Sequence, residues 1–383
     1  MLHRMHRRTL MSSLAAMALA PGARAAGVGP RALRFPADFR AHPDSKIEWW
    51  YATGTLHTAT GTPGDSAKGT PTEASPQFGF QITFFRSRTA VAATHASRFA
   101  AHQIVFAHAA LTDLAQRRLR HDQRLARSGF GIAGADEGDT GVALRQWRMR
   151  RSGPPQASVY EAQMGSDSAG FGFTLRLAST QPVLLQGQAG FSQKGPAITQ
   201  ASHYYSQPQL DVSGALSRDG NTQAVRGRAW LDHEWSDSLL DPQAVGWDWI
   251  GMNLLDGSAL TAFRLRRADG SGLYAGGSFR AAADARAGAG ASVRNFAPDE
   301  VQFTAQRTWA STSSRAVYPV QWKVDTPAGR FTVNALLDNQ ELDSRQSTGA
   351  IYWEGLSELL DERGQRVGLG YLEMTGYSGR LTL

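Results

Sequence analysis

The sequence predicts an all-β protein made of many short strands. Apolar residues occupy every second position in segments such as 78–84, and a period of two places one face of a strand inward. The turn-forming pair Asp256-Gly257 separates two such segments, as in a hairpin. Beyond the first 25 residues, no long stretch has a clean helical period. Many short strands with turns between them indicate a barrel or sandwich architecture.

Further strands and connections follow the same rules. Residues 171–177 and 331–337 repeat the alternation, and Thr326-Pro327-Ala328-Gly329 predicts a turn just before the second of them. The stretches 59–76 and 281–292 are rich in small and turn-forming residues. They cannot bury enough apolar surface to order themselves, so we expect solvated loops there.

The length of 383 residues allows one large or two medium domains. A polar stretch at 214–226 is the expected junction, which gives domains over 36–225 and 226–383. Each half contains a Trp-rich strand start, Glu48-Trp49-Trp50-Tyr51 in the first and Trp247-Asp248-Trp249-Ile250 in the second. This pairing fits two related barrels.

The first 25 residues have the pattern of an export signal. Arg4, Arg7 and Arg8 form a basic start, residues 10–19 are an uncharged apolar run, and Ala23-Arg24-Ala25 is a small-x-small cleavage site. The run is too short to span a bilayer. The paired arginines suit the twin-arginine route, with an ordinary secretory signal as the alternative. We expect a periplasmic or secreted protein.

The composition excludes several classes of function. The chain contains no cysteine, so disulfides, thiolate chemistry and cysteine-bound metals are excluded. The formal net charge of +7 falls to +3 without the four arginines of the first 25 residues. That weak charge does not favour nucleic acid as a partner. No segment is long and apolar enough to predict a transmembrane span, and no cofactor-binding motif is present.

Several clusters place large aromatic residues next to carboxylates. They are Glu48-Trp49-Trp50-Tyr51, Asp232-His233-Glu234-Trp235, Trp247-Asp248-Trp249, Tyr352-Trp353-Glu354 and Tyr371-Leu372-Glu373. Such residues suit a pocket with an apolar body and a few oriented polar groups. The alternative is a set of core aromatics with acids on the outward face. We predict ligand contacts from Glu48, Trp49, Trp50, Tyr51, Trp247, Asp248, Trp249, Tyr352, Trp353, Glu354, Tyr371 and Glu373.

The segment 230–235 is the candidate for chemistry. Strand alternation places His233 and Trp235 on one face and Asp232 and Glu234 on the other. His233 could donate a proton or contact a ligand, or it could be a structural hydrogen-bond hub. No His-Glu-x-x-His motif accompanies it, so no metal site is predicted. His102 and His108 are too far apart on one strand for a shared ion and are expected to be core or rim residues.

The chain resembles the AttH and carotenoid 1,2-hydratase (CrtC-like) family. The resemblance rests on Glu48-Trp49-Trp50-Tyr51-Ala52-Thr53-Gly54, Tyr204-Tyr205-Ser206-Gln207-Pro208, Gly227-Arg228-Ala229-Trp230-Leu231-Asp232-His233-Glu234-Trp235, Tyr352-Trp353-Glu354-Gly355 and Gly370-Tyr371-Leu372-Glu373-Met374-Thr375-Gly376-Tyr377. It covers about residues 36 to 380. The resemblance implies two tandem lipocalin-like β-barrel domains. The members of this family differ in activity. Some hydrate a carotenoid double bond, and others are labelled secreted hydrolases or are associated with ABC transport systems.

The hydratase reaction demands an acid that protonates an alkene and aromatic faces that stabilise the cation. His233 and Trp235 match the family's His-x-Trp pair, and Asp232 and Glu234 complete the catalytic candidates. The family's Tyr-x-Asp pair has no counterpart, because Phe263 stands where the tyrosine would be and no carboxylate follows it.

Three functions therefore remain open. The first is an exported carrier that binds an apolar or lipid-like ligand, as the periplasmic partner of an ABC transporter. The second is a hydro-lyase that adds water to an isoprenoid double bond. The third and weakest is a hydrolase, because the Gly-x-Ser-x-Gly nucleophile motif is absent.

Overall fold

The computed structural model describes residues 28–59, 75–92, 94–238, 240–283 and 292–381. The predicted export signal lies outside these residues, as do most of the loops predicted at 59–76 and 281–292. The described residues form two large antiparallel sheets and two short 3-10 helices, η1 (Ala37–Phe39) and η2 (Pro298–Glu300). The all-β prediction is confirmed.

The first sheet contains the strands up to β13, in the order β4-β3-β2-β1-β13-β12-β9-β8-β7-β6-β5, with β10 and β11 added on β12. Their bounds are β1 (Ile47–Thr58), β2 (Phe78–Arg88), β3 (Gln103–Asp113), β4 (Arg118–Arg127), β5 (Ala133–Ala135), β6 (Gly141–Leu144), β7 (Trp147–Ser152), β8 (Val159–Ser166), β9 (Phe171–Ala178), β10 (Leu184–Leu185), β11 (Phe191–Gln193), β12 (Ala201–Arg218) and β13 (Asn221–Ser238).

The second sheet has the order β17-β16-β15-β14-β23-β22-β20-β19-β18, with β21 added on β22. Its strands are β14 (Gly246–Leu254), β15 (Ala259–Arg266), β16 (Gly272–Arg280), β17 (Val293–Phe296), β18 (Gln302–Ala310), β19 (Val317–Thr326), β20 (Gly329–Ala335), β21 (Glu341–Ser344), β22 (Ala350–Leu360) and β23 (Arg366–Met374). In both sheets the first strand pairs with the second strand on one side and with the last strand on the other. The two halves therefore share one topological plan.

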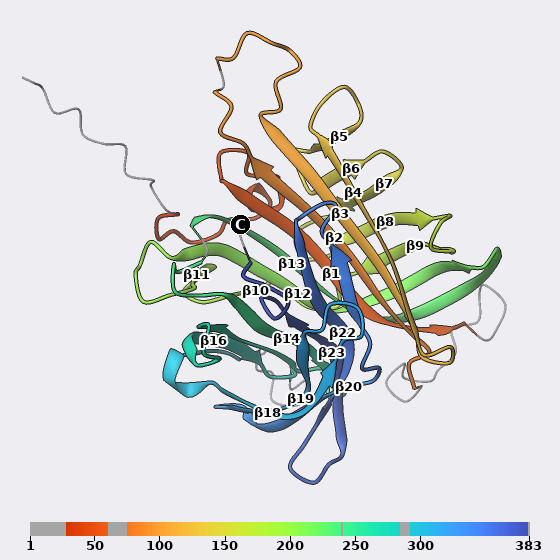
Figure 1. Ribbon diagram of the computed structural model, residues 1–383, viewed down its shortest axis with the longest axis vertical. Coiled ribbons are helices and arrows are strands. Elements are labelled where there is room, and N and C mark those ends of the chain that lie inside the picture. The colour runs from red at the N-terminus through yellow and green to blue at the C-terminus, as the bar shows by residue number, and fades with distance from the viewer. Residues whose placement is uncertain (1–27, 60–74, 93, 239, 284–291, 382–383) are drawn as a thin grey trace, which may run out of the picture.

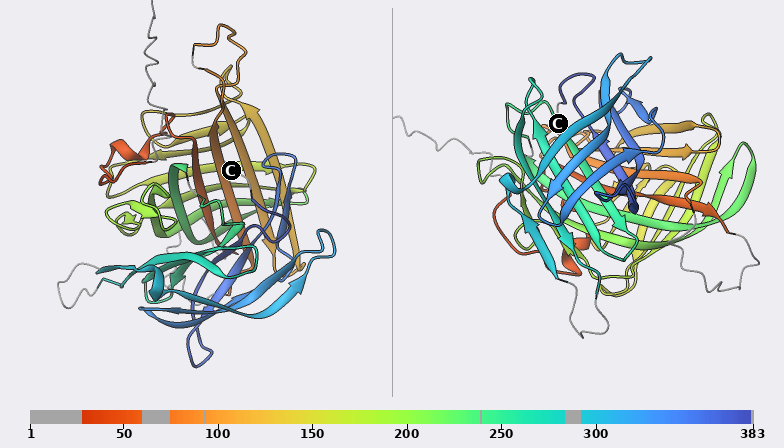
Figure 2. Two further views of the ribbon diagram at one scale, coloured as in Figure 1. Left: turned by 60° about the vertical axis from the view of Figure 1, so that its left-hand side comes forward. Right: turned by 90° about the horizontal axis from the view of Figure 1, so that it is seen from below.

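Each sheet curls around a core of its own. The first core includes Phe80, Phe173 and Trp147, and the second includes Trp322 and Trp353. Arg124 of β4 helps to close the first sheet, because its guanidinium donates to the carbonyl of Gly165 and lies 4.1 Å from the ring centre of Trp147. The curled sheets lie one above the other (Figure 1; Figure 2, left), and the view from below shows their strands crossing (Figure 2, right).

The predicted strands at 78–84 and 171–177 fall in β2 and β9, and the strand predicted at 331–337 begins in β20, which ends at Ala335. The turn at Asp256-Gly257 joins β14 to β15, and residues 326–329 join β19 to β20. The predicted domain junction needs correction. The polar stretch 214–226 holds the turn between β12 and β13, and residues 226–238 belong to the first sheet, which is separated from the second between 238 and 246.

The sheets touch closely at one end. Gly79 of β2 has no side chain, and a Cβ atom there would lie 2.5 Å from the Tyr371 hydroxyl and 2.9 Å from Leu356. Gln209, in a bulge of β12, adds hydrogen bonds to the carbonyls of Leu254 and Ser258 at 2.9 and 2.8 Å. This contact fixes the outer face of one sheet against the outer face of the other.

Candidate functional site

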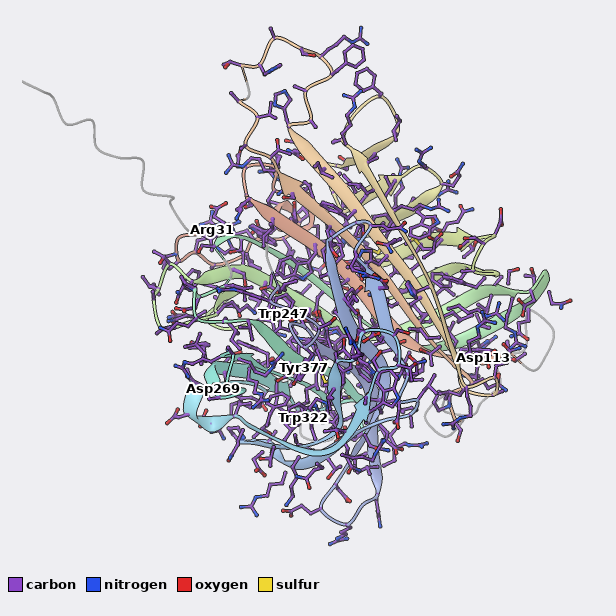
Figure 3. The ribbon with its side chains drawn as sticks, in the orientation of Figure 1. Arg31, Asp113, Trp247, Asp269, Trp322 and Tyr377 are labelled. Carbon is purple, nitrogen blue, oxygen red and sulfur yellow. The ribbon has the colours of Figure 1, made fainter. Side chains whose placement is uncertain are left out.

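A cavity of about 250 Å³ lies between the two sheets. On β1, Trp49 and Tyr51 face the second sheet, while Trp50 and Ala52 pack in the first core, as a period of two requires. Figure 3 shows Trp247 near the middle of the molecule, whereas Trp322 lies within the second sheet. Most of the predicted site residues line this cavity: Glu48, Trp49, Tyr51, Asp232, Glu234, Trp247, Trp249, Tyr352, Glu354 and Glu373.

Two matching rows of side chains form opposite walls. In the first sheet, Glu234, Trp49 and Phe85 are direct cross-strand partners on β13, β1 and β2. In the second sheet, Glu373, Trp249 and Phe263 are partners on the equivalent strands β23, β14 and β15. All six residues line the cavity. Each half of the chain therefore contributes an acid, a tryptophan and a phenylalanine in the same register.

The second sheet adds another acid next to its row. Glu354 of β22 lies directly opposite Glu373 on β23, so their side chains share one face about 5 Å apart at Cβ. The Oε2 atom of Glu354 accepts a hydrogen bond from Gln81 Nε2 at 2.6 Å. Its Oε1 atom is buried and has no hydrogen-bond partner among the described residues. Neither Glu354 nor Glu373 forms an ion pair within the described part of the chain.

The acids of the first sheet have more partners. Asp232 accepts hydrogen bonds from Ser206 Oγ at 2.5 Å and Trp230 Nε1 at 2.7 Å. Glu234 accepts from Ser202, and its Oε1 lies 3.2 Å from the ammonium of Lys194. That ammonium also lies 4.5 Å from the ring centres of Tyr204 and Phe263. Lys194 therefore forms an ion pair with an acid of the first wall and meets the second wall only at the ring of Phe263.

Burial raises the pKa of three carboxyl groups that line the cavity. Burial and the charge of Glu373 raise the pKa of Glu354 well above its usual range. Burial, together with the charges of Asp232 and Glu234, raises the pKa of Glu373 to about 7. Burial also raises the pKa of Asp232 to about 7, despite the hydrogen bonds it accepts. The cavity thus holds carboxyl groups that keep or exchange protons near neutral pH.

A second polar network surrounds Glu48 at the edge of the cavity. Its carboxylate accepts from His42 Nδ1 at 2.9 Å, Arg86 Nε at 2.9 Å and His233 Nε2 at 2.8 Å. Burial alone would raise the pKa of Glu48, but the hydrogen bonds from His233 and His42 outweigh it and hold the pKa well below its usual range. His42 also faces Asp38 through its other ring nitrogen, so both ring nitrogens are donors.

His233 and Trp235 belong to this network and do not line the cavity. His233 is fully buried, and its second ring nitrogen accepts from the Tyr205 hydroxyl at 3.0 Å. Burial lowers the pKa of His233 to about 4, so the ring is neutral and both nitrogens are occupied. Trp235 stacks on His42 with ring centres 3.6 Å apart. The predicted alternation of 230–235 holds, and it directs Asp232 and Glu234, not His233, into the cavity.

The remaining predicted residues also lie outside the cavity. Trp50 and Trp353 are in the cores of the first and second sheets. Tyr371 packs where the sheets touch. Asp248 is buried and pairs with Arg264 at 2.8 Å and Arg266 at 3.2 Å. The neighbouring arginines make Asp248 part of the framework of the second sheet.

Sequence reasoning missed Gln81, His108, Lys194 and Tyr204. His108 was expected at a core or rim, but it lines the cavity and bonds to the Tyr352 hydroxyl at 2.7 Å. Gln81 lies on the face of β2 opposite the apolar alternation, a buried position that the pattern gave no reason to inspect. Lys194 comes from a connection, so no strand period predicts where it points.

The atoms of His42, Glu48 and His233 that could bind a metal lie within 4.8 Å of one another. Arg86 donates to the same Glu48 carboxylate. A metal ion there would sit beside a buried guanidinium, and the repulsion of two buried charges disfavours such a site. The network fits a structural role better than metal binding.

No helix among the described residues is long and apolar enough to cross a bilayer. A family model described as AttH-like matches residues 26–377. A crystal structure of an AttH protein from Nitrosomonas europaea is 45% identical, covers 91% of this chain and 98% of its own, and has a TM-score of 0.78. The structure of kievitone hydratase from Nectria haematococca is 15% identical, with 91% and 94% covered and a TM-score of 0.64. Among curated proteins, none matches this chain.

Proposed function

The chain belongs to the AttH-like family, and we propose that its inter-sheet cavity binds an apolar small molecule and carries out acid–base chemistry on it. The reaction that fits best is the addition or removal of water at a carbon–carbon double bond. The proposal concerns a neutral, isoprenoid-like substrate, because the aromatic walls exclude water and the paired acids supply protons.

One observation carries this proposal. Glu354 is buried in an aromatic cavity, accepts a hydrogen bond on Oε2, and leaves Oε1 without a partner among the described residues. Burial and the charge of Glu373 raise the pKa of this carboxyl well above its usual range, against the lowering effect of the nearby Tyr51 hydroxyl, and so favour its protonated form. The proton belongs on Oε1, because Oε2 accepts from Gln81. A buried acid with a free O–H is costly for a structural role and is what a general acid requires.

The neighbouring residues fit the remaining steps. Transfer of the Glu354 proton to one alkene carbon leaves a cation on the other, which the faces of Trp49 and Trp249 stabilise. Water then adds to the cation and gives its proton to Glu373, whose pKa of about 7 allows it to accept. Because Glu373 lies directly opposite Glu354, the proton returns to Glu354 and completes the cycle.

The fold is compatible with this chemistry. The kievitone hydratase structure has the same two-sheet frame, although at 15% identity it shows the fold alone. The absent Tyr-x-Asp pair of the carotenoid hydratases does not count against the proposal, since Glu354 and Glu373 supply acid and base from other strands. Both ring nitrogens of His233 form hydrogen bonds, one with Tyr205 and one with Glu48, so His233 has a structural role next to the cavity.

Isotope incorporation tests the proposal without knowledge of the natural substrate. We would incubate the purified protein in ¹⁸O-labelled water with a panel of isoprenoid alkenes and their tertiary alcohols, and measure label by mass spectrometry. The wild type is expected to label at least one compound. Glu354→Gln, which keeps the shape but loses the acidic proton, is expected to lower the rate by at least about 100-fold.

Glu358→Gln is the matched control, because Glu358 lies on the same strand but pairs with Arg366 outside the cavity. It should label at the wild-type rate. Equal labelling by the wild type and Glu354→Gln would contradict the proposed role of Glu354. Tight binding with no labelling by the wild type would favour a carrier instead.

The carrier function is the second candidate, and the aromatic lining of the cavity favours it. In that case we propose a periplasmic protein that holds a lipid-like ligand for an ABC transporter. Native mass spectrometry of protein purified from its own periplasm would show a bound ligand. Loss of that ligand in a Trp49→Ala, Trp249→Ala variant would place it in the cavity.

A further inference from the structure

Exposed apolar residues gather at one end of the first sheet. Phe99, in the connection between β2 and β3, is 65% exposed, and Phe130, between β4 and β5, is 48% exposed. Val91, Leu125 and Ile132 are also exposed and lie in the same connections or on β4. Both connections lie at the top of Figure 1. We call Val91, Phe99, Leu125, Phe130 and Ile132 the apical patch.

The patch is ordered by aromatic and cationic contacts. The rings of Phe99 and Phe130 stack with centres 5.6 Å apart and an angle of 2° between planes. The guanidinium of Arg127 lies 4.2 Å from the centre of Phe130, and that of Arg98 lies 5.4 Å from it. Two arginines therefore flank a pair of exposed rings, an arrangement typical of side chains that lie at a water–lipid interface.

The charge around the patch has one sign. Residues 87–112 and 123–135 contain no Asp or Glu, but they contain Arg88, Arg98, Arg124 and Arg127. An anionic surface would therefore meet arginines without repulsion from neighbouring carboxylates. Exposed phenylalanines within such a surface also indicate an apolar layer beneath the charges.

The patch is continuous with the cavity. Trp49, Phe85, Phe106 and Leu125 are successive cross-strand partners on β1 to β4, and so they share one face of the sheet. Trp49, Phe85 and Phe106 line the cavity, whereas Leu125 is 45% exposed. The next row runs from Ile47 through Ser87 and Ile104 to Arg127, which stacks on Phe130. An apolar track thus leads from the cavity to the patch.

We propose that the apical patch docks on the surface of an anionic lipid bilayer. Phe99 and Phe130 insert among the lipid chains at the interface, and Arg98 and Arg127 contact the headgroups. An apolar ligand can then pass between the bilayer and the cavity along the Leu125–Phe106–Phe85 row without crossing water. The proposed docking does not depend on whether the protein catalyses a reaction on the ligand in the cavity.

Vesicle binding tests this docking. We would measure co-sedimentation of the purified protein with phosphatidylcholine vesicles prepared with and without phosphatidylglycerol. The protein is expected to bind the anionic vesicles, with affinity that falls as salt rises. Phe99→Ser with Phe130→Ser should lower the partition constant by at least about tenfold, and Arg98→Gln with Arg127→Gln by about 25-fold, since each arginine contributes about fivefold.

Val293→Ser with Val317→Ser is the matched control, because these exposed residues lie on the second sheet, away from the patch. This variant should bind as the wild type does. Absence of binding to anionic vesicles would overturn the proposal, and so would binding that the Phe99 and Phe130 changes leave unaltered. A dimer in sedimentation equilibrium that those changes abolish would assign the patch to a second copy of the chain instead.

Discussion

Glu234 and Glu373 occupy equivalent places in the two halves of the molecule, yet their surroundings differ. Each lies on the last strand of its sheet, directly opposite a tryptophan of the first strand, and each lines the cavity. Glu234 has Lys194 and Ser202 as partners. Glu373 has no ion pair among the described residues, and burial raises its pKa to about 7. The same position thus holds an acid with a cationic partner in one half and an acid without one, among the described residues, in the other.

A second acid in each half, which pairs with an arginine, has more similar surroundings in the two halves. Glu48 pairs with Arg86 directly across β1 and β2, and Asp248 pairs with Arg264 directly across β14 and β15. Glu48 and Arg86 are buried at the edge of the cavity, whereas Asp248 is buried outside the cavity and its partner Arg264 is partly exposed. We call Glu48 and Asp248 the inner acids, and Glu234 and Glu373 the outer acids. Both halves pair the inner acid with an arginine, and they differ in the partners of the outer acid. A compensated acid maintains structure, whereas an uncompensated one is available for chemistry.

Removing the inner acids should have the largest effect on stability. Glu48→Ala leaves Arg86 buried without its carboxylate, and Asp248→Ala removes the carboxylate that pairs with the buried Arg266 and the partly exposed Arg264. Each variant should lose about 3–5 kcal/mol of unfolding free energy, the usual cost of breaking a buried pair. Urea denaturation measures it, with Asp343→Ala as the control because its pair with Arg345 is exposed and should cost under about 1 kcal/mol. Unequal losses would show that the two frameworks are not equivalent.

Changing the outer acid of the second half should raise stability, but only at high pH. A carboxyl with a raised folded-state pKa binds its proton more tightly when folded. Its contribution is therefore full below its unfolded pKa of 4.5 and is lost as the pH rises through about 7. Glu373→Gln removes this loss, so the unfolding free energy should rise by about 3 kcal/mol at pH 8 and change little at pH 5.

Urea denaturation at the two pH values checks this expectation, and the exposed Glu362→Gln serves as the control. A variant that is destabilised equally at pH 5 and pH 8 would indicate that Glu373 is a structural acid like Glu48. The same variant should also slow the labelling reaction, because the base that accepts the water proton is gone.

The smallest effect is expected from making the first half resemble the second. Lys194→Met removes the ammonium beside Glu234 but keeps a chain of similar shape against Tyr204 and Phe263. The variant should lose about 2 kcal/mol of unfolding free energy, because Glu234 is left buried without its cation. Urea denaturation measures this loss, and a second change, Glu234→Gln, should restore most of it. A loss that Glu234→Gln does not reduce would mean that Lys194 acts by packing alone.

Much of the fold could be predicted because strands with one buried face show a period of two. That period gave β2, β9 and β20, and it also separated Asp232 and Glu234 from His233. It could not show which face of β13 meets the cavity, because both faces are buried and both are polar. The position of Gln81 and His108 depends on the second sheet lying on the first, a contact between residues far apart in sequence. The pairing of Glu354 with Glu373 depends on strand register, which no local pattern specifies.

The strand order also has a consequence for synthesis. β1 begins at Ile47, yet one of its two partners is β13, which ends at Ser238, and β14 likewise pairs with β23 near the end of the chain. During translation, the first strand of each half must therefore remain without its last neighbour until the ribosome has made that entire half. Contacts of such long range form slowly and expose strand edges meanwhile. The cavity, which needs β22 and β23, can be completed only after the ribosome has made these two strands.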